Sequence, residues 1–171
     1  RSSDLYLSLI RHLDKNWHAI ALGRDRAADA IDMIAIALGT DRAGLAERPA
    51  LMAIINTNSP LTLDEPMADG LIELASAGQA VVATPFTLAG AMAPATLAGA
   101  LVLQNAEVLA CATLVQLVRP AAPFVYGSFT SNVDMRSGSP AFGTPEYAQA
   151  AQASGQLARR YGLPFRSSNT T

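Results

Sequence analysis

The strongest constraint on the fold is an alternation of short apolar runs with longer segments of helical spacing. The apolar runs lie at 18–22, 50–55, 80–84, 124–127 and 163–166. Within a run the apolar residues are continuous rather than alternating, which is typical of strands buried on both faces of a parallel sheet. Each segment between two runs is long enough for a helix, as a parallel crossover requires.

The segments around these runs have helical patterns, and several of their ends carry boundary signals. The predicted helices lie at 4–13, 28–38, 62–77, 94–118 and 144–161. Gly39 is placed to end the second helix. Thr62, with Glu65 three residues later, predicts a capping box for the third helix. Pro94 suits the first turn of the fourth helix, and Thr144 suits the N-cap of the last.

Two architectures share this order of elements: an open doubly wound sheet and a (β/α)₈ barrel. A nucleotide-binding open sheet carries a glycine-rich phosphate loop, and the sequence contains no GxGxxG or Walker motif. Small polar residues instead follow four strands: Asn56, Asn58, Thr84, Ser128, Thr130, Ser167, Ser168 and Asn169. In a barrel they converge at the face where active sites lie, although each alone also suits a turn or cap. We therefore predict an α/β fold, an incomplete (β/α)₈ barrel of about five strand–helix units.

Composition excludes several classes of function. The net charge is −2 and the basic residues are scattered, so nucleic-acid binding is not expected. With one cysteine, Cys111, and two histidines, neither an internal disulfide nor an internal zinc cluster is plausible, and a cytoplasmic location fits. Gln104 and Glu107 interrupt the longest apolar stretch, so we expect a helix buried against protein rather than a membrane span.

Two further features are candidates for ligand contacts. Glu107 lies mid-helix among apolar residues, where it either faces solvent, which we favour, or pairs within the protein. The long polar loop at 128–143 contains Asn132, Asp134 and Arg136, and long loops are often functional. Asp134 and Arg136 also suit a simple surface ion pair, which would contribute little stability.

Several segments together resemble the trimethylamine methyltransferase family. They are 84–91 (TPFTLAGA), 93–100 (APATLAGA), 125–135 (VYGSFTSNVDM), 140–147 (PAFGTPEY) and 156–164 (QLARRYGLP). The resemblance spans essentially the whole chain and is most specific over residues 80–169. It implies a (β/α)₈ barrel enzyme that moves a methyl group from a methylated amine to the cobalt of a corrinoid protein.

The resemblance also implies the cofactors and partners. The corrinoid (cobalamin) belongs to a cognate partner protein, so we expect this chain to bind no metal and no cofactor tightly. A trimethylammonium-type cation would be held by cation–π or carboxylate contacts. The side chains that we predict for those contacts are Tyr126, Phe129, Asp134 and Glu107. We identify no catalytic residue, and we expect a homo-oligomer.

Family membership has consequences for the length of the protein and for its substrate. The archaeal enzymes carry a pyrrolysine, whose site we expect beyond Thr171, whereas bacterial relatives without it are similar to glycine-betaine methyltransferases. A barrel takes about 250 residues. We therefore expect residues 1–171 to be a single partial barrel domain from a longer chain, inactive alone. A barrel that binds betaine without turnover is the alternative function, and a fragment stabilised by self-association is a third reading.

Overall fold

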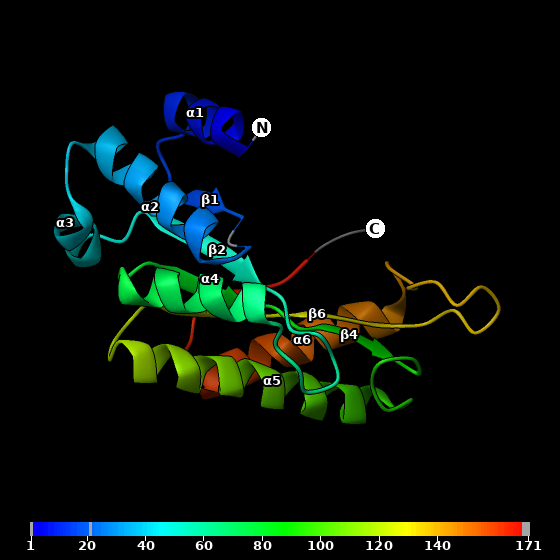
Figure 1. Cartoon of the computed structure of the whole chain (residues 1–171). Helices are drawn as coiled ribbons and strands as arrows, with labels where there is room; N and C mark the ends of the chain where they lie inside the picture. The colour runs from blue at the N-terminus through cyan, green and yellow to red at the C-terminus, as the bar shows by residue number, and fades with distance from the viewer. Residues whose placement is uncertain (1, 21, 169–171) are drawn as a thin grey trace. The chain divides into compact units, whose positions relative to one another are not determined.

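A computed structural model describes residues 2–20 and 22–168 (Figure 1). The chain divides into two compact units. Unit 1 comprises Arg1–Ile55, Asp64–Val82 and Thr113–Phe124. Unit 2 comprises Asn56–Leu63, Ala83–Ala112 and Val125–Thr171. The single domain that we predict for residues 1–171 stays a prediction.

Unit 1 is built from helices and parallel strands that alternate along the chain. Its elements are α1 (Ser2–His12), β1 (Trp17–Ala19), α2 (Arg24–Leu38), α3 (Arg42–Glu47), β2 (Leu51–Ile55), α4 (Glu65–Ser76) and most of β3 (Ala80–Ala83). Strand β1 pairs in parallel with β2, and β2 lies beside β3. Helix α2 packs against α4 (Figure 1). Ile31, Ile34, Leu71 and Leu74 from these two helices are fully buried and form the core.

Unit 2 contains a second set of parallel strands and two long helices. Its elements are β4 (Phe86–Ala89), most of α5 (Leu97–Val118), most of β5 (Phe124–Gly127), β6 (Phe129–Asn132), α6 (Pro145–Arg160) and β7 (Phe165–Arg166). Strand β5 pairs in parallel with β7. Strands β4 and β6 form their own parallel pair and run side by side (Figure 1). Helix α6 packs against β6 and β7.

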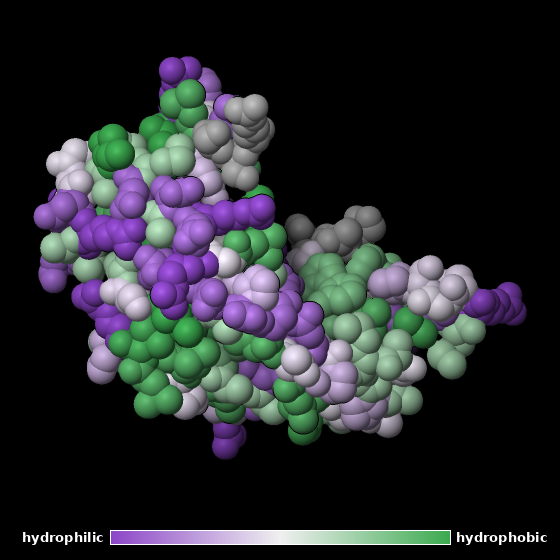
Figure 2. Space-filling model, viewed as in Figure 1, coloured by the Kyte–Doolittle hydropathy of each residue, from purple (hydrophilic) through white to green (hydrophobic). Residues whose placement is uncertain are grey.

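Helix α5 buries one stripe fully and leaves part of its remaining apolar surface exposed. The buried residues recur at helical spacing: Ala100, Gln104, Glu107, Val108, Cys111 and Val115. Val102 and Leu117 remain 72% and 78% exposed, and Figure 2 shows apolar surface on the side where α5 lies. By length and composition α5 is the one described helix that would suit a membrane span. The predicted burial against protein therefore holds for one stripe of the helix.

Most of the predicted elements are present, with shifted ends. Gly39 ends α2 in the left-handed conformation, and Thr144 accepts from the backbone N–H of Tyr147 at the start of α6. The predicted strand at 18–22 is described as 17–19, and its residue 21 lies outside the described residues. An α/β fold with parallel strands between helices is confirmed.

Other expectations were wrong. Asp64, rather than Thr62, caps α4, because its carboxylate accepts from the backbone N–H of Met67. Helix α5 begins at Leu97, so Pro94 precedes it. The polar connection before 50–55 contains the short helix α3, and β4 follows Pro85 as a strand that the apolar pattern did not indicate. The loop expected at 128–143 begins with strand β6.

Gln79 is a fully buried polar side chain that holds unit 1 together. Its Oε1 accepts hydrogen bonds from the backbone N–H groups of Ala50 and Leu51, both at 3.1 Å. Its Nε2 donates to the backbone carbonyls of Leu45 at 3.0 Å and Ala77 at 2.9 Å. One side chain thus bonds to four backbone groups, which come from α3, the start of β2 and the end of α4.

We predict that Gln79→Met, which keeps the shape but not the hydrogen bonds, lowers the free energy of unfolding by about 2–4 kcal/mol. Thermal unfolding measures the loss, and hydrogen exchange of the Leu51 amide locates it. The matched control is Gln116→Met. Gln116 also bonds to two backbone groups, those of Ala121 and Ala122, but it is exposed, so its loss stays below about 1 kcal/mol. Equal losses in the two variants would contradict this role for Gln79.

Candidate functional site

Three of the predicted site residues meet on the helix-facing side of β5 and β6, around Gln104 of α5. The Gln104 network consists of Gln104, Tyr126, Ser128, Thr130 and Ser154, all buried. Gln104 Oε1 accepts from Ser128 Oγ at 3.0 Å and also from Thr130 Oγ1. Gln104 Nε2 donates to Tyr126 Oη at 3.2 Å and to Ser154 Oγ at 3.0 Å. The network joins β5, β6, α5 and α6, and its polar groups satisfy one another.

Tyr126 is therefore a structural residue on this side of the strands. Its hydroxyl donates to Asn105 Oδ1 at 3.0 Å, and its ring packs against Tyr161 and Phe165 with centroids 6.4 Å apart in both cases. Burial raises the pKa of Tyr126 to about 12. A phenol of that pKa stays protonated at neutral pH and is not a general base there.

Glu107 anchors the loop that follows β2. Its Oε2 accepts from Ser59 Oγ at 2.8 Å and from Thr57 Oγ1, and its Oε1 accepts from the backbone N–H of Leu61 at 2.7 Å. The side chain is 3% exposed, so the expectation that it faces solvent was wrong. The physical reason is that three donors in the 56–63 loop compensate the carboxylate for the loss of water. The predicted contact of Glu107 with a ligand stays a prediction.

The other candidate residues after β2 and β3 lie in the segments that follow these strands. Asn56 Nδ2 donates to the backbone carbonyl of Thr84 at 3.0 Å, which ties the loop after β2 to the segment after β3. The backbone N–H of Asn58 donates to the carbonyl of Thr62 at 2.8 Å. The Thr84 hydroxyl is buried and has no hydrogen-bond partner among the described residues.

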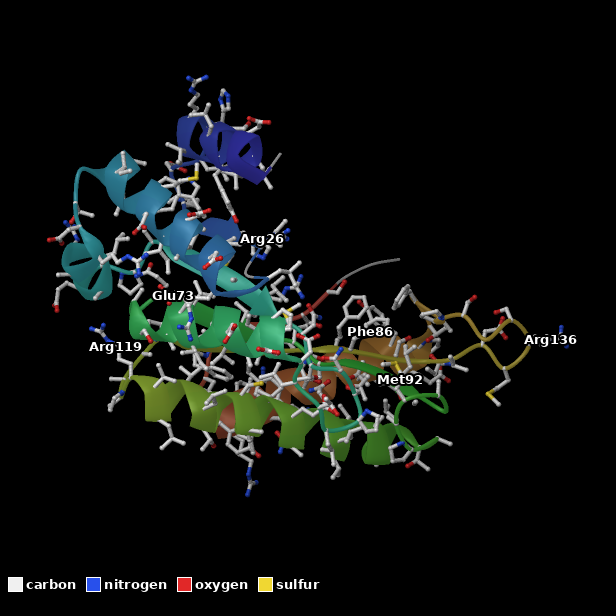
Figure 3. All side chains as sticks on the ribbon, in the orientation of Figure 1. Arg26, Glu73, Phe86, Met92, Arg119 and Arg136 are labelled. Carbon is white, nitrogen blue, oxygen red and sulfur yellow. The ribbon has the colours of Figure 1, made fainter. Side chains whose placement is uncertain are left out.

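The loop between β6 and α6 folds on its own polar residues. Asp134 accepts from the backbone N–H of Arg136 at 3.0 Å and from Ser137 Oγ at 2.7 Å, and these bonds hold its pKa below the ordinary value. Asn132 Oδ1 accepts from Thr144 Oγ1 at 2.9 Å. Figure 3 shows Arg136 at the outer end of this loop. Asp134 thus contacts the Arg136 backbone instead of forming the surface ion pair considered from the sequence.

The candidates at the end of the chain are only partly described. Ser167 and Ser168 follow β7 and are half-buried. The preceding carbonyl, that of Arg166, accepts from the backbone N–H of Ser128 at 3.0 Å, so the end of β7 lies beside the end of β5. Asn169 lies outside the described residues.

Four aromatic residues contact one another around Phe129, whose own ring points away from the Gln104 network. The aromatic cluster consists of Phe86, Phe129, Phe142 and Tyr147. Phe86 of β4 stacks on Phe129 of β6 with centroids 5.1 Å apart. Phe142 lies 5.2 Å from Phe129 and 5.9 Å from Tyr147. Phe129 alternates with Ser128 and Thr130, which contact Gln104, so its ring points the other way.

Gly127 lies close against Thr84, just before the stacked pair in both segments of the chain. The register places Phe86 opposite Phe129, and a Cβ built on Gly127 would lie 2.1 Å from Thr84 Oγ1. Any side chain at 127 would therefore collide with Thr84.

Sequence reasoning found one of the four rings, Phe129, and missed the other three. Phe86, Phe142 and Tyr147 all lie within the quoted family motifs, but nothing in their spacing indicated that they meet. Cys111 of α5 is a buried free cysteine. Burial, and next the charge of Glu107, raise the pKa of its thiol to about 11, so it is not a nucleophile at neutral pH. Among the described residues no group of three or more His, Cys, Asp or Glu suits a metal ion.

Comparison with known proteins decides the family. A family described as Trimethylamine methyltransferase (MTTB) matches residues 1–171. The chain belongs to this family of methyltransferases. The resemblance recognised in the motifs is therefore confirmed.

Individual relatives in this family carry two kinds of name. The chain is 44% identical over 167 residues to a glycine betaine methyltransferase of Desulfitobacterium hafniense (strain Y51), a match that covers 98% of the chain and 35% of the relative. It is 32% identical over 158 residues to trimethylamine methyltransferase MttB1 of Methanosarcina acetivorans, with 92% of the chain and 32% of the relative covered. The chain thus spans about a third of the length of these relatives.

We predict that Glu107→Ala destabilises the protein by about 3 kcal/mol, because three donors lose their acceptor, and that Glu107→Gln costs less. Thermal unfolding gives the size of both effects, and faster hydrogen exchange over residues 57–63 gives their location. Asp134→Asn is the control, since Asp134 is exposed and its partners lie within its own loop. Unchanged exchange over residues 57–63 in Glu107→Ala would refute the anchoring role.

We also predict a stability loss at alkaline pH from Tyr126. Its folded-state pKa of about 12 lies above its unfolded value of about 10, so its contribution is complete below pH 10 and is lost as the pH rises to 12. Tyr126→Phe removes the ionisable group. The difference in unfolding free energy between wild type and variant should therefore shrink by about 2–3 kcal/mol across this pH range. A constant difference, measured in denaturant titrations at each pH, would contradict the prediction.

Proposed function

We propose that the full-length protein transfers a methyl group from glycine betaine or a closely related methylated amine to the cobalt of a corrinoid protein. The observation that carries the proposal is the 44% identity, over 98% of the chain, to a protein named glycine betaine methyltransferase. The lower identity of 32% to a trimethylamine methyltransferase favours a betaine over trimethylamine.

The proposed reaction exchanges one bond for another. The bond between a methyl carbon and the positively charged nitrogen breaks, and its electron pair stays on the nitrogen, which becomes a neutral tertiary amine. The acceptor cobalt, in its Co(I) state, supplies both electrons of the new cobalt–carbon bond. The corrinoid is the methyl acceptor and belongs to the partner protein, so the task of this chain is to bind and orient the amine and to exclude water.

We extend the proposal to the architecture and the assembly. Parallel strands that alternate with helices support a (β/α)₈ barrel, of which these residues would supply about five strand–helix units. Such a barrel would place the residues that follow each strand at the face where barrel enzymes bind substrate. The homo-oligomer and the cytoplasmic location expected from the sequence belong to the same proposal.

The test uses the full-length protein with cob(I)alamin as a free acceptor and with glycine betaine, carnitine or trimethylamine as the donor. We expect the visible spectrum of methylcobalamin to develop with glycine betaine, together with one equivalent of dimethylglycine. Betaine labelled with deuterium in its methyl groups must give labelled methylcobalamin. Methyl transfer from none of the donors, with calorimetry showing that betaine still binds, would replace this proposal by a barrel that binds betaine without turnover.

A further inference from the structure

We propose that the aromatic cluster of Phe86, Phe129, Phe142 and Tyr147 is the binding site for the methylated ammonium group, which it recognises by cation–π contacts. The inference rests on the proposed function, because the identity of the cation comes from the substrate. It goes further by assigning the recognition to four named rings and by stating which physical property of the rings matters.

The geometry of the rings is the first support. Phe142 is inclined by 60° to Phe129, and Tyr147 by 67° to Phe142 and by 76° to Phe129. Three steeply inclined ring planes therefore meet within centroid distances of 5.2–6.3 Å. The negative faces of aromatic rings attract a cation within about 6 Å of the centroid, so walls set at such angles can face one ammonium group together.

The exposure of the rings is the second support. Phe142 is 37% exposed, and Phe86 and Phe129 are half-buried, although phenylalanine is among the residues most often fully buried. Tyr147 is 6% exposed, which fixes one wall, and its hydroxyl has no partner among the described residues. The cluster thus combines a rigid base with accessible ring surface.

The alternative cation sites predicted from the sequence are committed to other contacts. The Tyr126 ring lies on the helix-facing side and packs against Tyr161 and Phe165. Glu107 accepts three hydrogen bonds from the 56–63 loop. Asp134 bonds to its own loop. Phe129 is therefore the one member of that set that the structure places among other rings with exposed surface.

Cation recognition can be separated from apolar packing with a pair of ligands. Glycine betaine and 3,3-dimethylbutanoate have the same shape, because each joins a carboxylate to a group with three methyls. They differ in charge: the central nitrogen of betaine is positively charged, whereas the matching carbon of 3,3-dimethylbutanoate is neutral. If the rings act through their electrostatic faces, the full-length protein binds betaine more tightly by at least tenfold in Kd, measured by calorimetry. Equal Kd values would overturn the proposal.

Fluorination of one ring provides the sharper test. Phe142 in the full-length protein is replaced by phenylalanine with one, two or three ring fluorines, which progressively remove the negative charge from the ring face at nearly constant shape. We expect Kd for betaine to rise at each step, by about two- to thirtyfold in total, while Kd for 3,3-dimethylbutanoate stays constant. A flat series for betaine would refute a cation–π contact at Phe142.

The matched control is Phe165, which is 39% exposed but lies outside the aromatic cluster, because its ring contacts Tyr126 and the helix α6. Fluorination of Phe165 should leave both Kd values unchanged. Phe142→Leu should weaken betaine binding, and Tyr147→Phe, which retains the ring, should preserve the preference for betaine over its neutral analogue. Equal effects of fluorination at Phe142 and Phe165 would show a general structural effect and overturn the proposal.

These outcomes are separable from failure of the proposed function. If methylcobalamin forms but fluorination of Phe142 leaves the Kd for betaine unchanged, the proposed function stands and the aromatic site is refuted. If fluorination of Phe142 raises the Kd for betaine stepwise but no methyl group is transferred, the aromatic site stands and the proposed reaction is refuted.

Discussion

The parallel register between β4 and β6 is the constraint on which the candidate site depends. It sets Phe86 opposite Phe129, so two strands that are far apart in sequence present their rings on one face. Because side chains alternate along a strand, the same register turns Thr130 to the other face, where it bonds to Gln104 of α5. A slip by one residue would exchange the two faces, placing hydroxyls among the rings and the ring of Phe129 against the Gln104 network.

Hydrogen bonds between residues far apart in the sequence hold the strands and the helices in place, and they also satisfy buried polar groups. Glu107 on one side of α5 fixes the loop after β2, and Gln104, one turn earlier, fixes β5, β6 and α6. Both are buried polar side chains in a helix that is mostly apolar. In the low-dielectric interior a hydrogen bond is stronger than in water, and a polar group without a partner costs more free energy. The polar residues of α5 therefore specify which segments pack on it, a task that its apolar residues share only weakly.

The sequence predicted the order of strands and helices because continuous apolar runs and capping residues are local signals. It missed α3, β4 and β6, since each is short and β6 reads as a polar loop until its partner strand is known. It also failed for Glu107, whose partners lie 46–50 residues away in the sequence, so that nothing near it indicates burial. The aromatic cluster was not predicted for the same reason. Phe142 lies in the loop between β6 and α6 and Tyr147 at the start of α6, and only the folded chain brings them to Phe129.

An aromatic site for the donor has a consequence for the chemistry of methyl transfer. The nitrogen loses its positive charge as the methyl group leaves, so a ring face attracts the substrate more strongly than the transition state or the neutral product. Contacts that favour the ground state lower Kd but do not raise the rate of transfer. Partly exposed rings, which hold a cation less strongly than desolvated ones, limit this cost and ease the release of the neutral amine. On this reasoning the half-exposed state of Phe86, Phe129 and Phe142 suits a site that must recognise a charge and then let its neutral product go.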